Sequence, residues 1–503
     1  MGRNKRLVAN SVTSLLHQIT AVVSGFILPR LILSSFGSDV NGLVNSITQF
    51  LAVISFMELG VGAVVQSSLY KPLSDMNSDA ISSIISSANR FFRTIALILV
   101  VYIAGLMVLY PVIIDSVFSS TYIMGLILAM SISSFAQYYF GVVDRLLLIA
   151  DQKGYVSYIA QTATLLASTA ACVILIKFGA GIQFVKLTGS IIYLFRPIYL
   201  RIYVNKNYKL NRSIQYSGEP IKQKWNGVAQ HVAAVVLDNT DIIVLTMFST
   251  LANVSIYSVY FLVVNGVKTL FTSVTGGIQA LLGELWARRE INELKKTFSW
   301  TEWTIHTGAV FVFGCTASLI CPFIQIYTLG VEDANYYAPL FGFLLTTANT
   351  MHSLRLPYNI MILAGGHYKQ TQSNYIIAAV MNLVISIFAV SRFGLVGVAI
   401  GTLSAMLYQT IWMAVYVSKN FLLRPIKEIV KHLCVDALSF GLSYWLTSFI
   451  VIKELSYSSW IVLAIKTAVI WLTISCITNY IAYPNFVKRI LSLVHTKIKQ
   501  IMQ

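Results

Sequence analysis

Long apolar segments separated by short polar connections run along the whole chain. Segments of about eighteen or more apolar residues are long enough to cross a bilayer as helices. We therefore predict an all-α membrane protein with fourteen spanning helices, at residues 7–34, 43–70, 91–115, 122–150, 155–177, 183–204, 225–249, 253–283, 299–328, 336–364, 369–391, 395–418, 431–452 and 458–483.

The distribution of basic residues tests this helix count and orients the chain. With the N-terminus inside, 27 of the 36 Lys and Arg fall in inner segments, and only Lys177, Arg392 and Lys453 fall in outer ones. A missed or extra helix would destroy this alternation, which follows the positive-inside rule. We predict a multi-pass protein of a cytoplasmic membrane with both termini in the cytoplasm. The formal charge of +17 is then explained by orientation rather than by nucleic-acid binding.

Three short matches indicate an internal duplication. Residues 203–208 (YVNKNY) recur as 416–421 (YVSKNF), the Phe-Gly pair at 178–179 recurs at 393–394, and 148–150 resembles 362–364, all at offsets of 213 to 215 residues. An even number of helices per copy gives two parallel repeats related by an axis along the membrane normal. We expect a six-helix bundle at 1–204, a cytoplasmic linker at 205–224, a second bundle at 225–420, two further helices at 431–483 and a basic tail at 484–503.

Six basic residues fall inside predicted helices, where a charge costs about 2.5–3.5 kcal/mol and usually faces a bundle interior or a wet cavity. They are Arg30, Lys186, Arg196, Lys268, Arg355 and Lys466. We predict that they bind the anionic part of a substrate. Arg196 lies roughly 15 Å along its helix, shares a face with Lys186 and Tyr193, and precedes Pro197. The alternatives are that Lys186 and Arg30 anchor at the interface, that Arg196 pairs with a carboxylate, and that Lys466 contacts lipid.

Three acids in predicted helices are candidates for ion coupling: Glu58, Asp238 and Asp241. For Asp238 and Asp241 we favour the alternative that they are ion-pair partners of basic residues. Glu284 and Glu302 lie near inner helix ends, where we expect them to be solvated. The sequence holds no nucleotide-binding P-loop, no hydrolase or metalloprotease motif and no cluster with metal-ligand spacing, so we predict a transporter rather than an enzyme, with no cofactor and no metal.

Two segments carry a family resemblance. They are residues 57–62 (MELGVG) with the following loop 69–79 (LYKPLSDMNSD), and residues 237–241 (LDNTD). Together with the arrangement of six, six and two helices, they resemble the polysaccharide transporters (Wzx-type oligosaccharide flippases) of the multidrug/oligosaccharidyl-lipid/polysaccharide flippase superfamily. The resemblance implies a fold similar to the MATE and MurJ transporters.

It also implies a function, partners and a location. The function is the flipping of undecaprenyl-diphosphate-linked oligosaccharide, such as an O-antigen, capsule or exopolysaccharide repeat unit, across a bacterial inner membrane by alternating access. The partners would be membrane lipids and the polymerase and glycosyltransferases of the same pathway. A lipid II flippase and a multidrug or cation antiporter of the same superfamily remain alternatives. A membrane scaffold, or a glycan polymerase or ligase, is disfavoured because every predicted outer loop is short.

Overall fold

The computed structural model describes residues 3–53, 55–114, 116–212, 214, 221, 240–452, 454–489 and 492. In these ranges the chain is all helix and turn, and nine helical segments are long and apolar enough to cross a membrane. The predicted all-α fold of a multi-pass membrane protein is confirmed. Two compact units, Met1–Ser258 and Val259–Gln503, divide the chain, and each is considered by itself.

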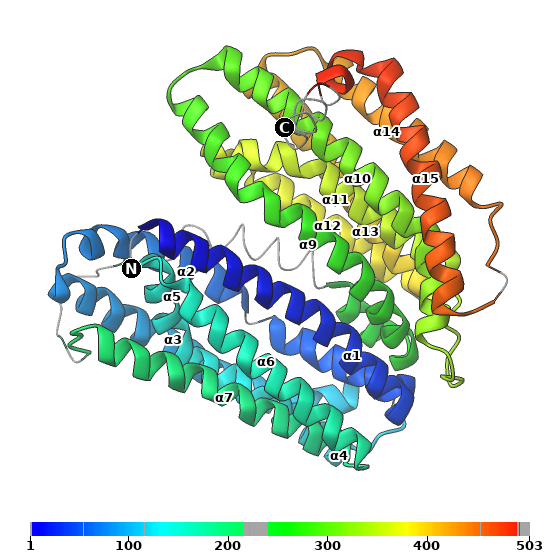
Figure 1. Ribbon diagram of the computed structural model, residues 1–503. Coiled ribbons are helices and arrows are strands. Elements are labelled where there is room, and N and C mark those ends of the chain that lie inside the picture. Colours follow the sequence, from blue (N-terminus) through cyan, green and yellow to red (C-terminus); the bar gives the residue numbers. More distant parts are fainter. Residues whose placement is uncertain are drawn as a thin grey trace, which may run out of the picture. The chain divides into compact units, whose positions relative to one another are not determined.

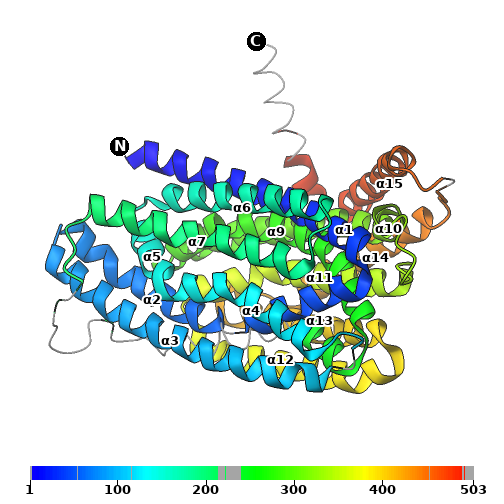
Figure 2. The ribbon, with the colours of Figure 1, turned by 90° about the horizontal axis from the view of Figure 1, so that it is seen from below.

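The first unit is built from antiparallel helices joined by short turns (Figure 1). Its elements are α1 (Arg3–Ala52), α2 (Ser55–Ser74), α3 (Ser78–Ile113), α4 (Ser120–Ala136), the π-helical turn η1 (Gln137–Gly141), α5 (Val142–Ala150), α6 (Gly154–Lys177), α7 (Ile182–Asn207), a helical stretch at 240–248 and the start of α9 (Leu251–Ala287). Figure 2 shows α6 packed between α1 and α7. The start of α9 belongs here because Asn41 Nδ2 of α1 donates to Ser255 Oγ at 2.8 Å.

The second unit continues from α9 with the remaining helices. They are α10 (Ile291–Tyr327), α11 (Pro339–Ala364), α12 (Tyr368–Phe393), α13 (Leu395–Val417), the π-helical turn η2 (Ser418–Leu422), α14 (Ile426–Thr447) and α15 (Tyr457–Ala482). Within it α13 packs against α11 and α12, while α10 contacts α11, α14 and α15.

Some predicted boundaries differ from the observed ones. The second predicted helix, 43–70, is divided between the end of α1 and α2, and α1 itself changes direction at Gly37, where φ is 84°. The polar loop predicted between residues 70 and 91 is mostly helix. Asn77 caps α3 by accepting from the Ala80 backbone N–H at 3.0 Å. The seventh predicted helix, 225–249, is described only from residue 240.

Backbone geometry repeats where the sequence predicts duplication. Gln152 (φ 56°) and Gly366 (φ 74°) occupy the turn after α5 and the turn after α11. Gly179 (φ 77°) and Gly394 (φ 52°) follow α6 and α12. The left-handed turns thus recur at the offsets of the sequence matches. The predicted domain limits themselves stay predictions.

Candidate functional site

A polar cavity inside the first unit is the candidate site. Its volume is about 240 Å³, and its lining comes from four helices and the η1 turn. Residues Ser133, Ser134, Gln137, Gly141, Arg145, Gln161, Tyr193, Arg196, Pro197 and Leu200 line it. A neighbouring cavity of about 370 Å³ shares Ser133, Ser134, Gln137 and Tyr193 with the first and adds Lys186. Because they share these polar residues, the two cavities adjoin each other.

Helix α7 supplies three of the functional side chains. Lys186, Tyr193 and Arg196 are spaced by seven and three residues, so a helix of 3.6 residues per turn places them on one face. All three line the cavities, as that spacing predicts. Pro197, next to Arg196, packs against Gly141 of η1, where an added Cβ would come within 3.0 Å of the proline ring. This close approach brings α7 against the π-helical turn that carries Gln137.

Arg196 is held by neutral groups. Its Nε and one terminal nitrogen donate to Thr164 Oγ1 of α6 at 3.2 and 3.1 Å. Its guanidinium carbon lies 4.9 Å from the centre of the Tyr193 ring, a cation–π distance. The predicted alternative, an ion pair with a carboxylate, is not found for Arg196 among the described residues. Its positive charge is therefore available to an anion in the cavity.

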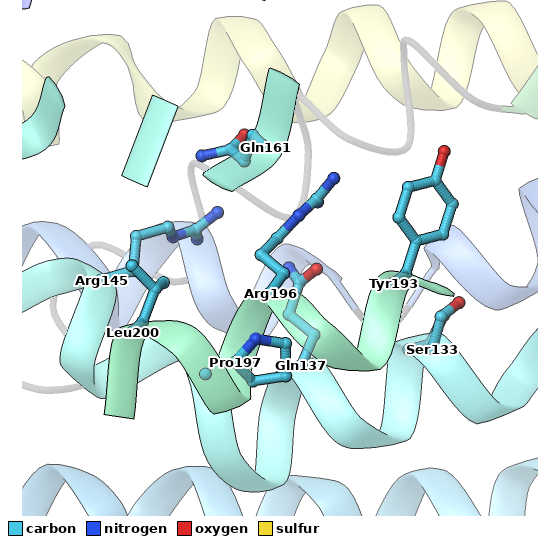
Figure 3. Close-up of a pocket in the computed structure, with 10 residues that line it drawn as sticks. Ser133, Gln137, Arg145, Gln161, Tyr193, Arg196, Pro197 and Leu200 are labelled. Carbon is cyan, nitrogen blue, oxygen red and sulfur yellow. The ribbon is translucent and has the colours of Figure 1, made fainter. Parts of the chain in front are cut away.

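Arg145 brings a second guanidinium to the same space from α5. Figure 3 shows Arg145 and Arg196 extending into the cavity from different helices, with Gln161 of α6 above them. The carboxylate adjacent in sequence, Asp144, is fully buried and is already bound by two other arginines. Arg212 donates to it at 2.8 Å and Arg201 lies 3.5 Å away. Asp144 therefore has two arginine partners.

The lining has the composition of an anion site. Among the described residues that surround the two cavities there are three cations and no Asp or Glu. The remaining polar groups are serine and threonine hydroxyls, two glutamines, two tyrosines and the Cys172 thiol, which donate hydrogen bonds without adding charge. Two planar guanidinium groups close together match the geometry of phosphate oxygens better than ammonium groups do.

Arg355 and Lys268 belong to the second unit and lie near each other. Arg355 of α11 is buried, and one of its terminal nitrogens lies 2.9 Å from His352 Nδ1. Both Arg355 and Lys268 of α9 are close enough to His352 to act on its ring electrostatically. These two predicted site residues therefore share His352 as a neighbour.

The other predicted site residues lie elsewhere. Arg30 is half-buried on α1, directly after Pro29, and lines neither cavity. Lys466 is exposed on α15. Asp241 is buried and accepts a hydrogen bond from the Tyr257 hydroxyl at 2.8 Å. The side chain of Glu58 and the whole of Asp238 lie outside the described residues.

Sequence reasoning missed Arg145 and misplaced Glu302. Arg145 was counted among the cytoplasmic cations because it lies near a predicted helix end, and nothing local distinguishes it from them. Glu302, expected to be solvated, is fully buried and ion-paired with Arg424. Glu284 is exposed as expected and pairs with Arg288. For Glu302 a signal was present, since Glu302 and His306 share one face of the predicted helix 299–328, which has no other ionic residue.

The fold can now be compared with known proteins. No protein-family model and no curated protein sequence matches the chain. Among solved structures, the lipid II flippase MurJ in an inward closed conformation is similar at a TM-score of 0.72 and 15% identity, over 95% of this chain and 100% of that one. An inward-facing MATE-family multidrug resistance transporter of the MOP superfamily is similar at a TM-score of 0.62 and 10% identity, over 82% and 98%.

A third similar structure is a MOP-superfamily transporter from Pyrococcus furiosus, described as having a binding pocket of reverse polarity. Its TM-score is 0.58 at 12% identity, over 83% of this chain and 96% of that one. At these identities the similarity defines the fold. The chain thus has the fold of the MOP-superfamily transporters, and the predicted similarity to MATE and MurJ proteins is confirmed.

Proposed function

We propose that this chain is a flippase that moves undecaprenyl-diphosphate-linked oligosaccharide from the cytoplasmic to the outer leaflet of a bacterial inner membrane. The observation that carries the proposal is the pair of neighbouring cavities, one lined by Arg145 and Arg196 and the other by Lys186, with no carboxylate in their described lining. A diphosphate is the anionic part of such a substrate, and charge-assisted hydrogen bonds from arginine are its strongest recognition elements.

In this proposal each part of the substrate has its own environment. Arg145 and Arg196 bind the diphosphate, while Gln137, Gln161 and Tyr193 donate hydrogen bonds to the sugar nearest to it. Because the cavity is too polar for a polyprenyl chain, the tail stays in the bilayer while the headgroup crosses. The two units rock against each other to open the path first to one side and then to the other.

The membrane orientation supports the same direction of transport. Basic residues concentrate at the ends predicted to be inside, so both termini face the cytoplasm, where lipid-linked sugars are assembled. Lys268 and Arg355 of the second unit would receive the headgroup as it passes. Glu58, Asp238 and Asp241 remain the candidates for coupling to an ion gradient, and Arg30 and Lys466 for contacts with lipid phosphates.

Binding by purified protein tests the proposal directly. We expect undecaprenyl diphosphate to bind the wild type in detergent and to bind Arg145→Ala and Arg196→Ala about tenfold or more weakly, because each loses a charge-assisted contact worth about 1.5–3 kcal/mol. Native mass spectrometry or thermophoresis gives the Kd. In a strain lacking its own oligosaccharide flippase, the same variants should lose surface glycan while remaining in the membrane.

Arg392→Ala is the matched control, since Arg392 is exposed at the end of α12 and lines neither cavity. It should bind and complement as the wild type does. Equal binding by all four proteins would refute the site. Binding of a lipophilic cation in place of the diphosphate would favour a multidrug antiporter.

The lipid II flippase remains the second candidate, because the fold similarity to MurJ extends over nearly the whole chain and lipid II would offer the same diphosphate to the arginines. Rescue of cells depleted of their lipid II flippase would favour this candidate. Rescue of surface glycan alone would favour the oligosaccharide substrate.

A further inference from the structure

A second group of ionisable side chains lies buried in the second unit, away from Lys268 and Arg355. It occupies the junction of α10, α11 and α14, three helices that contact one another through α10. Its members are Glu302 and His306 of α10, Tyr358 of α11, Arg424 from the turn before α14, and His432 and Asp436 of α14. The flipping mechanism above makes no use of them.

One half of this group is a closed ion pair. Both terminal nitrogens of Arg424 donate to Glu302, one to each carboxylate oxygen. The Tyr358 hydroxyl also donates to Glu302 Oε1 at 2.6 Å. Since Glu302 is fully buried, these donors replace the water that the carboxylate has lost. The charge of Glu302 is therefore balanced by Arg424, and the hydroxyl hydrogen of Tyr358 is donated to Glu302.

The other half depends on His306, whose two ring nitrogens both face acceptors. Nδ1 lies 2.6 Å from Asp436 Oδ2 on α14. Nε2 lies 3.1 Å from the backbone carbonyl oxygen of Leu354 on α11, and 3.4 Å from the Tyr358 oxygen. A carbonyl oxygen cannot donate and an ionised carboxylate can only accept, so both contacts are hydrogen bonds only when His306 carries a proton on each nitrogen.

We propose that the His306–Asp436 pair is a proton-binding site, and that the bound proton ties α14 to α11 through α10. Neutral imidazole has a single N–H, so it can bond to Asp436 or to Leu354 but not to both. When Nε2 loses its proton, its lone pair faces the Leu354 carbonyl and repels it. The same lone pair can accept the Tyr358 hydroxyl, which then leaves Glu302. Proton release thus loosens the junction in two places.

The charged and titratable groups around the His306 ring determine the pH range in which it loses its proton. Asp436 and His432 face His306 from α14, with the two imidazole rings 5.6 Å apart, while Glu302 lies on α10 and Tyr358 on α11. His432 Nε2 is 3.5 Å from Glu302 and its ring stacks on Tyr483 at 4.8 Å. Because Arg424 neutralises Glu302, the Asp436 carboxylate is the counterion of His306. Both hydrogen bonds of His306 are present at low pH. The bond from Nε2 to Leu354 is lost as the pH rises and the proton leaves.

The consequence reaches Arg355. Leu354 immediately precedes it on α11, and Pro357 two residues later cannot donate a helical hydrogen bond. This part of α11 therefore lacks one helical hydrogen bond. The carbonyl oxygen of Leu354 lies within hydrogen-bond distance of His306 Nε2. A proton on His306 therefore acts on the backbone beside a buried cation. The inference concerns the proton alone and stands whether or not the proposed lipid substrate is correct.

Amide hydrogen exchange of full-length protein in nanodiscs tests this inference. Peptides from α11 that include Leu354 are followed between about pH 5 and pH 9, with correction for the intrinsic effect of pH on exchange. We expect a step in the wild type in which the Leu354 region of α11 exchanges about tenfold faster above the titration of the pair than below it. His306→Gln should abolish the step. Asp436→Asn should move it to lower pH, because the imidazolium loses its counterion.

Tyr358→Phe is the matched control, since it removes a hydroxyl from the same group but leaves both acceptors of His306. It should keep the step. A flat wild-type profile, or a step that survives in His306→Gln, would overturn the proposal. A step lost in His432→Gln but kept in His306→Gln would assign the proton to His432 and also refute it.

A measurement on the wild type covers the case in which the variants fail to fold. In protein labelled with ¹⁵N-histidine and ¹³C-aspartate, solid-state NMR identifies the imidazole that correlates with an aspartate carboxylate. Two protonated nitrogens at low pH and one at high pH are expected for that ring. A ring that is neutral across the range would contradict the inference.

Discussion

Single buried charges in this chain are accommodated in two different ways. Asp144 and Glu302, both fully buried, are bound by arginines that enter from the turn after α7 and the turn after η2. Arg196, in contrast, rests on a hydroxyl and an aromatic ring. The first arrangement is complete without a ligand, whereas the second leaves a positive charge for one. This difference separates the structural charges from the candidate site.

The Glu302–Arg424 pair gives a prediction at this scale. Arg424→Met should destabilise the protein by about 3–5 kcal/mol, because a carboxylate would be left buried without its partner. Thermal unfolding of the purified protein in detergent measures the change. Arg288→Met, which breaks the exposed pair with Glu284, should cost less than about 1 kcal/mol. Similar losses in the two variants would contradict the structural role given to Arg424.

Among the elements, close helix contacts depend on residues with small side chains. At Gly314 of α10 an added Cβ would lie 1.8 Å from the Trp471 ring of α15, which is fully buried. The Trp471 ring also donates from Nε1 to Ser318 at 3.3 Å, one turn further along α10. Because Gly314 has no side chain, the Trp471 ring packs directly against α10 and α15 lies close to it, as helices do at small residues in membrane bundles generally.

Gly314→Ala should therefore destabilise the protein by about 1–3 kcal/mol, because the Trp471 ring must move. Gly308→Ala is the control in the same helix. Its Cβ would meet Phe271 at an ordinary 3.6 Å, so the substitution should be neutral or slightly stabilising. Thermal unfolding in detergent compares the two. Equal effects would show that α15 does not depend on this contact.

For the whole molecule, the duplication accounts for the direction of the chain. The left-handed turns after α5 and α11, and those after α6 and α12, recur at nearly one spacing, as expected if two copies run through the membrane in the same sense. The predicted total of fourteen spanning helices would return the C-terminus to the side of the N-terminus. The basic residues at the predicted inner ends predict that this side is the cytoplasm.

Fusions test this topology. Green fluorescent protein attached after residue 503 should fluoresce, because it folds in the cytoplasm. Alkaline phosphatase inserted between α14 and α15, near Ser456, should be active, because that turn is predicted to be outside. A C-terminal fusion that does not fluoresce, or a fusion near Ser456 without phosphatase activity, would contradict the predicted alternation.

The amino-acid sequence determined the features that depend on local regularity. Apolar length predicted the helices, positive charge at their ends predicted the orientation, and three short sequence matches indicated the duplication. Helical spacing alone placed Lys186, Tyr193 and Arg196 on one face, which is where they lie. Boundaries were less certain because polar caps such as Asn77 begin a helix inside a stretch that looks like a loop.

Only the tertiary structure decided which charges meet. Arg145 looks like a cytoplasmic cation in the sequence, yet packing of α5 beside α6 and α7 turns it toward Arg196. Glu302 and Arg424 are far apart in the chain and become a buried pair because α10 packs against α14. The period of a helix fixes which of its own residues share a face. Which face meets which neighbour depends on packing between distant segments, and the cavity is made by that packing.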